Sequence, residues 1–240
     1  MVDPRTSIIN ERMKSIRNII AVSGGKGGVG KSLVASTLAL ILARKGRRVG
    51  LFDLDFTSPS THIILGIEDI KPKEEKGIIP PKVLGLQYMS IIYYSGDYAT
   101  PLRGADVSNA LIELLSITRW EQLDYLILDM PPGISDATLD MIRLIKNIKF
   151  LIVTTPSQLA FETVKKLTSL LTSLKIPVIG IIENMKMNQP QAIQKQTQKL
   201  GLIFLGEIPY DTKIEETLGN TNQLLRTTFA KKIEHMASKM

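Results

Sequence analysis

Residues 25–32 carry the clearest chemical signal in the sequence. They read Gly-Lys-Gly-Gly-Val-Gly-Lys-Ser and match the pattern G-x-x-x-x-G-K-[ST] at every fixed position. Glycines let a backbone curl until its N–H groups point at phosphate oxygens, and a following helix presents its positive end to the same anion. The pattern predicts that Lys31 reaches the β- and γ-phosphates and that the Ser32 hydroxyl binds Mg²⁺. The expected backbone contacts to the phosphates come from Gly25, Gly27, Gly28, Val29 and Gly30.

Lys26 occupies the second position of this loop, which the basic pattern leaves open. One reading is a solvated surface lysine. The other is a second cation for the phosphates. Lys26 comes too early in the loop to contact the same phosphates as Lys31 easily. As a second cation it would therefore act across a dimer interface.

Two carboxylates, Asp53 and Asp55, follow the apolar run at residues 48–53. Carboxylates beside a phosphate loop repel phosphate unless they serve Mg²⁺ or a water molecule. Asp55 is therefore the candidate that orients an attacking water, and Asp53 is expected to support the metal site or the loop. The alternative is a pair that only ends a strand or caps a helix.

Asp129 ends another apolar run, residues 123–129, and Pro131-Pro132-Gly133 follows. An apolar strand that ends in aspartate is the Walker B arrangement, which holds Mg²⁺ directly or through water. The segment after it is expected to be a switch loop in which the Gly133 N–H senses the γ-phosphate. Asp136 is expected to cap the next helix.

Asn184 follows a predicted strand at residues 177–182. An asparagine at a strand end can hydrogen-bond the edge of a nucleobase, although asparagine also forms turns. Met185, Met187 and Met236 are interpreted as packing residues and not as ligands of a soft metal.

The elements that must position these residues alternate between strand and helix. This alternation predicts an α/β fold with a doubly wound, mostly parallel sheet and helices on both faces, in which ligands bind at the carboxyl ends of the strands. Residues 1–17 are expected to be an N-terminal arm or short helix, and residues 18–240 a single domain. Residues 66–82 are expected to be a loop region. The expected strands are 18–23, 48–53, 123–129, 150–154, 177–182 and 202–205, with an extended segment at 83–92. The expected helices are 31–45, 106–117, 135–146, 158–174 and 191–200, followed by two terminal helical segments.

Composition narrows the possible functions of these 240 residues, of which 44% are hydrophobic and none is cysteine. Disulfides, zinc–thiolate sites and cysteine-ligated iron–sulphur clusters within this chain are thereby excluded. The net charge of +7 is spread along the sequence. It permits contact with nucleic acid or an anionic membrane, but an ordinary solvated surface explains it as well. Residues 1–17 lack the apolar stretch of a signal peptide, and no run approaches the roughly 20 apolar residues of a membrane span, so a cytoplasmic protein is expected.

Taken together, these motifs resemble a known group of proteins. With Lys26 as the signature lysine, residues 25–32 are similar to the deviant Walker A loop of the MinD/ParA superfamily of dimerising ATPases. Within it, the sequence most resembles the Mrp family of ATP-binding iron–sulphur cluster carriers. The supporting segments run in family order: Asp53-Leu-Asp-Phe-Thr-Ser-Pro-Ser60, Leu102-Arg-Gly104, the run 123–133, Val153-Thr-Thr-Pro156, Glu183-Asn-Met185 and Phe204-Leu-Gly-Glu-Ile-Pro209.

The resemblance implies a P-loop NTPase fold and a homodimer that sandwiches ATP and Mg²⁺. Lys26 would reach the nucleotide of the partner subunit and Asp55 would position water. Asn184 and residues 208–211, with Pro209 and Tyr210, would hold adenine. Hydrolysis would be slow and would gate a conformational cycle.

The sequence departs from the Mrp pattern at one place. Mrp-type carriers usually have a Cys-x-x-Cys pair shortly after the Glu-Asn-Met segment, whereas residues 186–193 read Lys-Met-Asn-Gln-Pro-Gln-Ala-Ile. We therefore expect an Mrp-type ATPase linked to iron–sulphur cluster assembly or carriage that lacks cysteine ligands of its own. A cysteine-bearing homologue or iron–sulphur apoproteins are the expected partners. The main alternative is a positioning or partition ATPase that binds DNA or membrane in its ATP state. A non-catalytic, nucleotide-gated interaction protein ranks last, because Asp55 and Asp129 are both present.

Overall fold

A computed structural model describes residues 3–95, 104–187 and 191–240, and its central feature is an eight-stranded sheet. The strand order is β10-β9-β8-β1-β7-β2-β6-β5, and every neighbouring pair is parallel except β5 with β6. A separate antiparallel pair joins β3 and β4. The fold class predicted from the alternating elements is confirmed. The strands are β1 (Ile16–Gly24), β2 (Val49–Asp53), β3 (Lys73–Glu74), β4 (Ile78–Ile79), β5 (Lys82–Val83), β6 (Leu86–Ser90), β7 (Leu123–Asp129), β8 (Ile148–Thr154), β9 (Val178–Lys186) and β10 (Phe204–Pro209).

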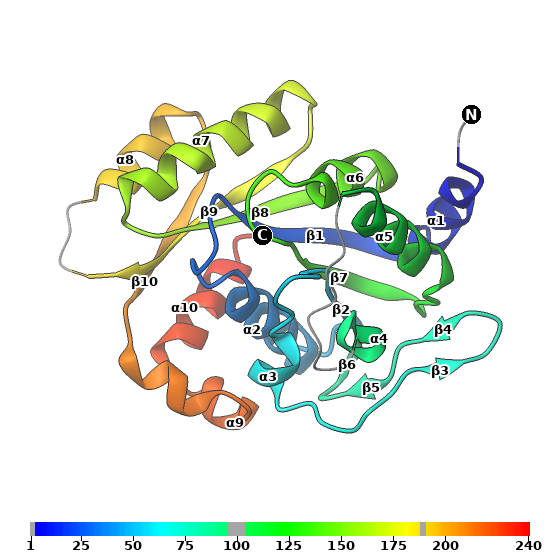
Figure 1. The fold of residues 1–240 in the computed structure, drawn as a ribbon. Coiled ribbons are helices and arrows are strands. Elements are labelled where there is room, and N and C mark those ends of the chain that lie inside the picture. Colours follow the sequence, from blue (N-terminus) through cyan, green and yellow to red (C-terminus); the bar gives the residue numbers. More distant parts are fainter. Residues whose placement is uncertain (1–2, 96–103, 188–190) are drawn as a thin grey trace.

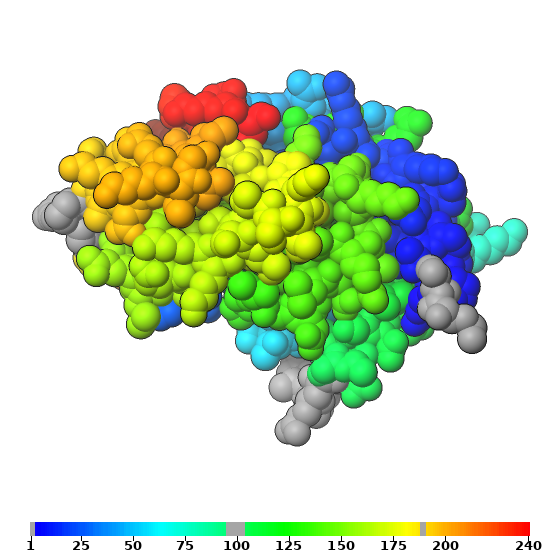
Figure 2. Space-filling model, turned by 90° about the horizontal axis from the view of Figure 1, so that it is seen from above, coloured from blue at the N-terminus to red at the C-terminus, as the bar shows by residue number. Residues whose placement is uncertain are grey.

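Helices cover both faces of the sheet (Figure 1). One layer contains α1 (Arg5–Met13), α5 (Ala105–Ile117), α6 (Asp136–Leu144), α7 (Gln158–Ser173) and α8 (Ala192–Lys199), and Figure 2 looks down on it from above. The other contains α2 (Lys31–Arg44), α3 (Thr61–Leu65), α9 (Thr221–Leu224) and α10 (Thr228–Ala237). The 3-10 helix η1 (Thr212–Thr217) precedes α9, and the short helix α4 (Ile92–Ser95) follows β6. Among these helices of the described residues, none is long and apolar enough to cross a bilayer.

The sheet is buried on both faces because its strands are almost continuously apolar. Along β1, Ile19 and Ala21 join one core while Ile20 and Val22 join the other, as the two-residue period of a strand requires. Parallel strands place their carboxyl ends along one edge. The phosphate loop, Asp53 and Asp129 therefore come together at that edge.

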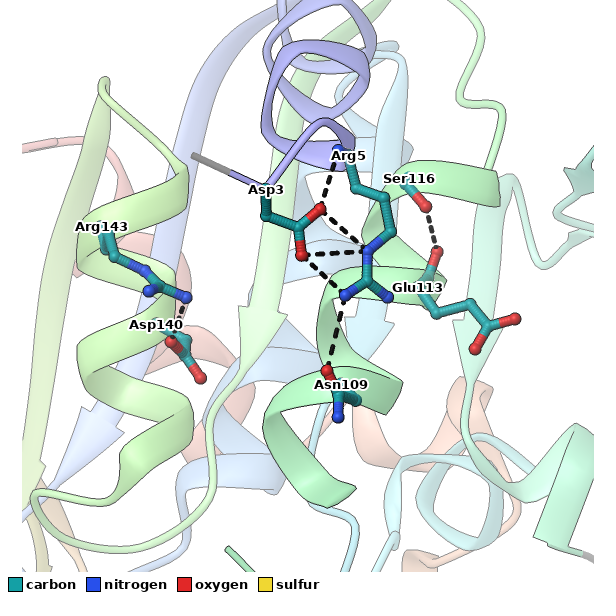
Figure 3. Close-up of polar contacts among 7 residues, drawn as sticks. All are labelled: Asp3, Arg5, Asn109, Glu113, Ser116, Asp140 and Arg143. Carbon is teal, nitrogen blue, oxygen red and sulfur yellow. Dashed lines mark hydrogen bonds and ion pairs between the residues drawn. The ribbon is translucent and has the colours of Figure 1, made fainter. Parts of the chain in front are cut away.

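Residues 1–17 contribute more than an arm. Within them the structure has α1, whose Ile9 and Met13 are buried in the core beside α5, and β1 begins at Ile16. Figure 3 shows the polar contacts at the start of α1, where Arg5 forms an ion pair with Asp3 and donates a hydrogen bond to Asn109 of α5 at 3.4 Å. Hydrogen bonds from Arg5 lower the pKa of Asp3 to about 2. The N-terminal segment thus packs on the domain as an integral element.

Several element boundaries differ from those expected. β9 continues to Lys186, so Asn184 lies inside a strand and not after it. This extension beyond the expected limit of residue 182 buries Glu183 and Lys186, and an ion pair of 3.1 Å between them compensates for their burial. The region 66–82, expected as a loop, contains β3, β4 and the first residue of β5.

The cap of α6 also differs from the expectation. Ser135, and not Asp136, is the N-cap residue, because its side chain accepts the hydrogen bond from the Thr138 N–H at 3.3 Å. Asp136 is the first helical residue, where a carboxylate favours the helix dipole without capping it.

Candidate nucleotide-binding site

The phosphate loop joins the end of β1 to the start of α2. Gly30 is the N-cap residue of α2 and has a left-handed backbone, with φ of 87°. A Cβ atom at Gly30 would lie only 2.3 Å from Nδ2 of Asn184, whereas a Cβ at Gly27 or Gly28 would meet no described atom within 4 Å. The loop is therefore tightly packed behind Gly30 and open in front of Gly27 and Gly28. That geometry suits a phosphate that approaches the backbone from the open side.

A groove of about 590 Å³ opens beside this loop. The start of α2, the β2–α3 segment, α3 and η1 form its walls together with the loop. Its lining residues are Gly27, Gly28, Gly30, Lys31, Ser32, Leu33, Asp55, Thr57, Ser58, Ser60, Ile63, Ile64, Pro132, Met185, Ile214, Glu215 and Leu218.

Asp129 presents a buried carboxylate at this edge of the sheet. It is fully buried, and neither of its oxygens makes a hydrogen bond of normal geometry with the described residues, although the Ser32 hydroxyl lies close enough to favour its charged form. Burial raises the pKa of Asp129 well above its ordinary value and the charge of Asp53 raises it further, while the Ser32 hydroxyl and the charge of Lys31 lower it. An unpartnered buried carboxylate is costly. A hard cation is the ligand that such an oxygen pair beside a hydroxyl fits best, so Asp129 and Ser32 fit Mg²⁺.

Asp53 is paired in register with Asp129 on the neighbouring strand, but its oxygens have partners. Its Oδ2 accepts hydrogen bonds from the Ser60 and Thr61 N–H groups, both at 3.1 Å, and from the Thr61 hydroxyl at 2.7 Å. Its Oδ1 accepts the Asp55 N–H at 3.1 Å. Burial raises the pKa of Asp53 to about 6, and these hydrogen bonds oppose the rise. Asp53 thus holds the β2–α3 segment in place, whereas its expected contact with the metal would have to compete with four donors.

Asp55 lies in the groove wall, where its Oδ1 accepts the N–H groups of Thr57 and Ser58 at 3.0 and 3.1 Å. No hydrogen bond joins its Oδ2 to any residue in the described part of the chain. One oxygen is therefore fixed by the loop and the other remains for a water molecule.

Three groups of residues predicted to contact the nucleotide have partners or positions that the sequence does not reveal, and their contacts with a nucleotide stay predictions. The Gly133 N–H donates to the Gly24 carbonyl at 3.0 Å, so it does not point freely at a γ-phosphate. Nδ2 of Asn184 donates to the carbonyl of Val29 at 3.0 Å, so this side chain supports the phosphate loop. Pro209 and Tyr210 are exposed and lie outside the residues that line the groove. These partners belong to segments far apart in the sequence, which is why spacing alone does not reveal them.

The apolar end of the groove is formed by Met185, expected as a packing residue, and by side chains that no sequence motif marks. Ile214 and Leu218 contribute to it from η1 and the residue after it, Ile63 from α3, and Met185 from β9. Met185 has a left-handed backbone, with φ of 59°, which also turns the last residue of β9 toward the same face as Glu183. Isolated apolar residues carry no chemical signal in a sequence, and only the fold assembles them into one wall.

Lys26 is half-buried and does not line the groove. Two other expectations lie outside the described residues: Leu102 and Arg103 of the Leu-Arg-Gly segment, and residues 188–190 of the cysteine-free stretch.

Known proteins that are similar to this chain agree with the fold and the nucleotide site described above. A family model described as NUBPL iron-transfer P-loop NTPase matches residues 15–240. An iron–sulfur cluster carrier protein of Pseudomonas fragi is 41% identical over 181 residues, which cover 73% of this chain and 63% of that protein. One of Methanocaldococcus jannaschii is 40% identical over 225 residues, covering 87% of this chain and 78% of that protein.

Among solved structures, a nucleotide-binding protein of Archaeoglobus fulgidus in complex with ADP has a TM-score of 0.77 and 30% identity. The match covers 94% of this chain and 95% of that one. Against several of the bacterial cluster carriers, this chain spans about three fifths of their length. The resemblance inferred from the deviant loop and the Mrp-type segments is confirmed, and this chain belongs to the family of NUBPL iron-transfer P-loop NTPases.

Proposed function

We propose that this protein binds Mg-ATP and hydrolyses it slowly as a homodimer, in the service of iron–sulphur cluster assembly or carriage. The observation that carries the nucleotide part is the fully buried, unpartnered carboxylate of Asp129 beside Ser32 and a complete phosphate loop. A fold retains such a costly group when a ligand compensates for it. Asp129 and Ser32 would hold Mg²⁺, which would supply positive charge to neutralise the phosphate oxygens.

The residues of the chain divide the remaining work. The loop N–H groups and Lys31 would bind the β- and γ-phosphates. Asp55 would accept a proton of the attacking water through its second oxygen, while the Thr57 and Ser58 N–H groups hold the first. The apolar wall at Ile214 and Leu218 would receive the nucleobase.

The surface around the phosphate loop supports a second copy of the chain as partner. Ile134, Leu139 and Leu159 are exposed by 42, 43 and 66%. Ile134 follows Gly133, whose N–H donates to the Gly24 carbonyl just before the loop, and Leu159 lies on α7, which packs against Gly25. Leu139 lies on α6. Exposed apolar side chains grouped around a ligand site are typical of an interface. In such a dimer, Lys26 would reach the phosphates of the facing subunit.

The iron–sulphur part of the proposal rests on the family, whose model and curated relatives are described by iron transfer and cluster carriage. Since these 240 residues contain no cysteine, thiolate ligands for a cluster must come from outside them. A cysteine-bearing homologue fits this requirement, because a mixed dimer would retain the ATP sites. The alternative of a DNA- or membrane-positioning ATPase has no comparable observation in its favour.

The ATPase test is phosphate release from Mg-ATP by the wild type and by Lys31→Ala, purified in parallel. We expect slow, Mg²⁺-dependent release by the wild type. Lys31→Ala should release phosphate at least about a hundredfold more slowly, because the lysine charge that stabilises the transferred phosphoryl group is gone. Equal release by both proteins would mean that a contaminant or another site is responsible.

The cluster test uses this chain co-purified with a cysteine-bearing homologue and reconstituted with iron and sulphide without oxygen. We expect iron and sulphide in a complex that contains both chains, and none bound to this chain alone. Failure of the two chains to associate, with or without Mg-ATP, would contradict a role in cluster carriage through such a partner.

A further inference from the structure

Two glycines join the two walls of the nucleotide groove by direct backbone contact. Gly66 follows α3 and Gly219 follows η1, and both have left-handed backbones with φ of 64° and 79°. The Gly219 N–H donates to the Ile64 carbonyl at 3.2 Å. A Cβ atom at Gly66 would lie 2.3 Å from the Gly219 carbonyl oxygen, so no side chain fits between the two segments. Movement of one wall must therefore displace the other.

The opposite end of α3 is tied to the catalytic segment. Its first residue, Thr61, donates to Asp53 Oδ2 through both its N–H group and its hydroxyl. Asp53 in turn accepts the Asp55 N–H on its other oxygen. Asp55 is thus linked to α3 by consecutive hydrogen bonds through a single buried carboxylate. A shift of this five-residue helix would be passed to the carboxylate proposed to orient the water.

The same two walls enclose the apolar end of the groove. Ile63 and Ile64 face it from α3, and Ile214 and Leu218 face it from η1 and the residue that precedes Gly219. A flat nucleobase in this space would touch both walls at once, whereas the phosphates would touch only the loop end. Base contact is therefore in a position to set the spacing of α3 from η1.

We infer that α3 links the nucleobase to hydrolysis: a base seated against Ile214 and Leu218 fixes α3 through the Gly66–Gly219 contact, and α3 fixes Asp55. Gly66 and Gly219 are positioning residues in this scheme. The inference rests on the proposed ATPase function. It adds that the nucleobase should raise the rate of hydrolysis, and not only the affinity for the nucleotide.

Inorganic tripolyphosphate separates these two effects, because it offers the same phosphate chain without a base. In both substrates, water attacks the terminal phosphorus and its bond to the bridging oxygen breaks, which releases phosphate and leaves ADP or diphosphate. With Mg²⁺ saturating, we expect wild-type kcat for tripolyphosphate to be about tenfold below that for ATP, since small errors in the position of a catalytic group reduce rate strongly.

The deciding variant is Gly66→Ala, which pushes the two walls apart. We expect it to lower kcat for ATP to about the tripolyphosphate value and to change the tripolyphosphate rate much less. The matched control is Gly46→Ala. Gly46 also has a left-handed backbone, with φ of 76°, but its Cβ would meet no described atom within 4 Å. This control should keep the wild-type ratio of the two kcat values.

A second variant and a second measurement test the inference even if Gly66→Ala folds poorly. Ile214→Ala should lower the ratio of kcat for ATP to kcat for tripolyphosphate, and a wall that only binds the base would raise KM alone. ADP, but not diphosphate, should slow amide hydrogen exchange at residues 57–61 in the wild type, and Gly66→Ala should lose this protection.

The inference is wrong if wild-type kcat is the same for both substrates, or if Gly66→Ala lowers both rates by the same factor. Equal protection of residues 57–61 by ADP and diphosphate would overturn it as well. Failure of the proposed function would look different, because wild-type protein would then release no phosphate from ATP at all.

Discussion

At the scale of single residues, two neighbouring aspartates at the ends of adjacent strands have opposite environments. Asp53 accepts four hydrogen bonds from its own segment, whereas Asp129 accepts none from the described residues. Buried polar groups are normally satisfied, so the difference separates a structural carboxylate from one kept for a ligand. The unpartnered carboxylate of Asp129 therefore destabilises the protein when no nucleotide is bound.

Asp129→Asn should therefore stabilise the metal-free protein, by about 1 to 3 kcal/mol at pH 8, because it removes an unpartnered buried charge. Since folding raises the pKa of Asp129, its destabilising effect grows as the pH rises from the ordinary value toward the raised one. The gain should be smaller at pH 5 than at pH 8. Thermal unfolding in EDTA at both pH values measures it, and the same variant should lose Mg²⁺-dependent ATP binding.

The control for this prediction is Asp124→Asn on the same strand. Asp124 forms an ion pair with Arg48 at 2.8 Å, and hydrogen bonds from Arg48 lower its pKa, so neutralising it should not stabilise the protein. A lower melting temperature for Asp129→Asn than for the wild type would show that the carboxylate has a partner in solution.

Sequence alone locates the residues whose chemistry is local. The phosphate loop, Asp55 and Asp129 are recognisable because each sits at the junction of an apolar run and a turn. The roles of Gly133 and Asn184 are not, because their partners are the carbonyls of Gly24 and Val29, which only the fold brings close.

At the scale of elements, buried parallel strands are the most predictable parts. The limits predicted for β7 agree with the structure, because a buried apolar run leads directly to its terminal aspartate and Asp124 near its start pairs with Arg48. The polar C-terminal end of β9 is not predicted from the sequence, because Glu183 and Lys186 pair with each other inside the protein. For the residues of α1 the sequence does not decide between an arm and a short helix, because the segment is polar and only Ile9 and Met13 are buried in the core.

Ile9→Ala tests whether α1 is an integral element. Ile9 is fully buried, so we expect a loss of about 2 to 5 kcal/mol in the free energy of unfolding. Its neighbour Ile8 is 45% exposed and provides the matched control, for which Ile8→Ala should cost no more than about 0.5 kcal/mol. Urea unfolding measures both values. Equal, small effects would mean that α1 detaches from α5 and α6, contrary to its packing and to the polar contacts in Figure 3.

At the scale of the whole molecule, the chain holds most of a nucleotide site but leaves one side of the phosphate loop open. Gly27 and Gly28 are exposed, Lys26 lies outside the groove, and the segment after β7 and helix α7 carry the exposed side chains of Ile134 and Leu159. A second copy would close the site and bring its Lys26 to the phosphates. Each site would then combine Asp55 of one subunit with Lys26 of the other.

Complementation between two inactive variants tests this shared site most directly. Lys26→Ala and Asp55→Ala should each release little phosphate from Mg-ATP alone. In a mixed dimer, the subunit with Lys26→Ala keeps its Asp55 and receives an intact lysine from its partner, so one of the two sites is complete. An equal mixture should therefore recover about a quarter of the wild-type rate, given random pairing in a symmetric dimer. No recovery, with mixed dimers present, would mean that Lys26 acts within its own subunit or not at all, and would contradict an ATPase that shares its sites.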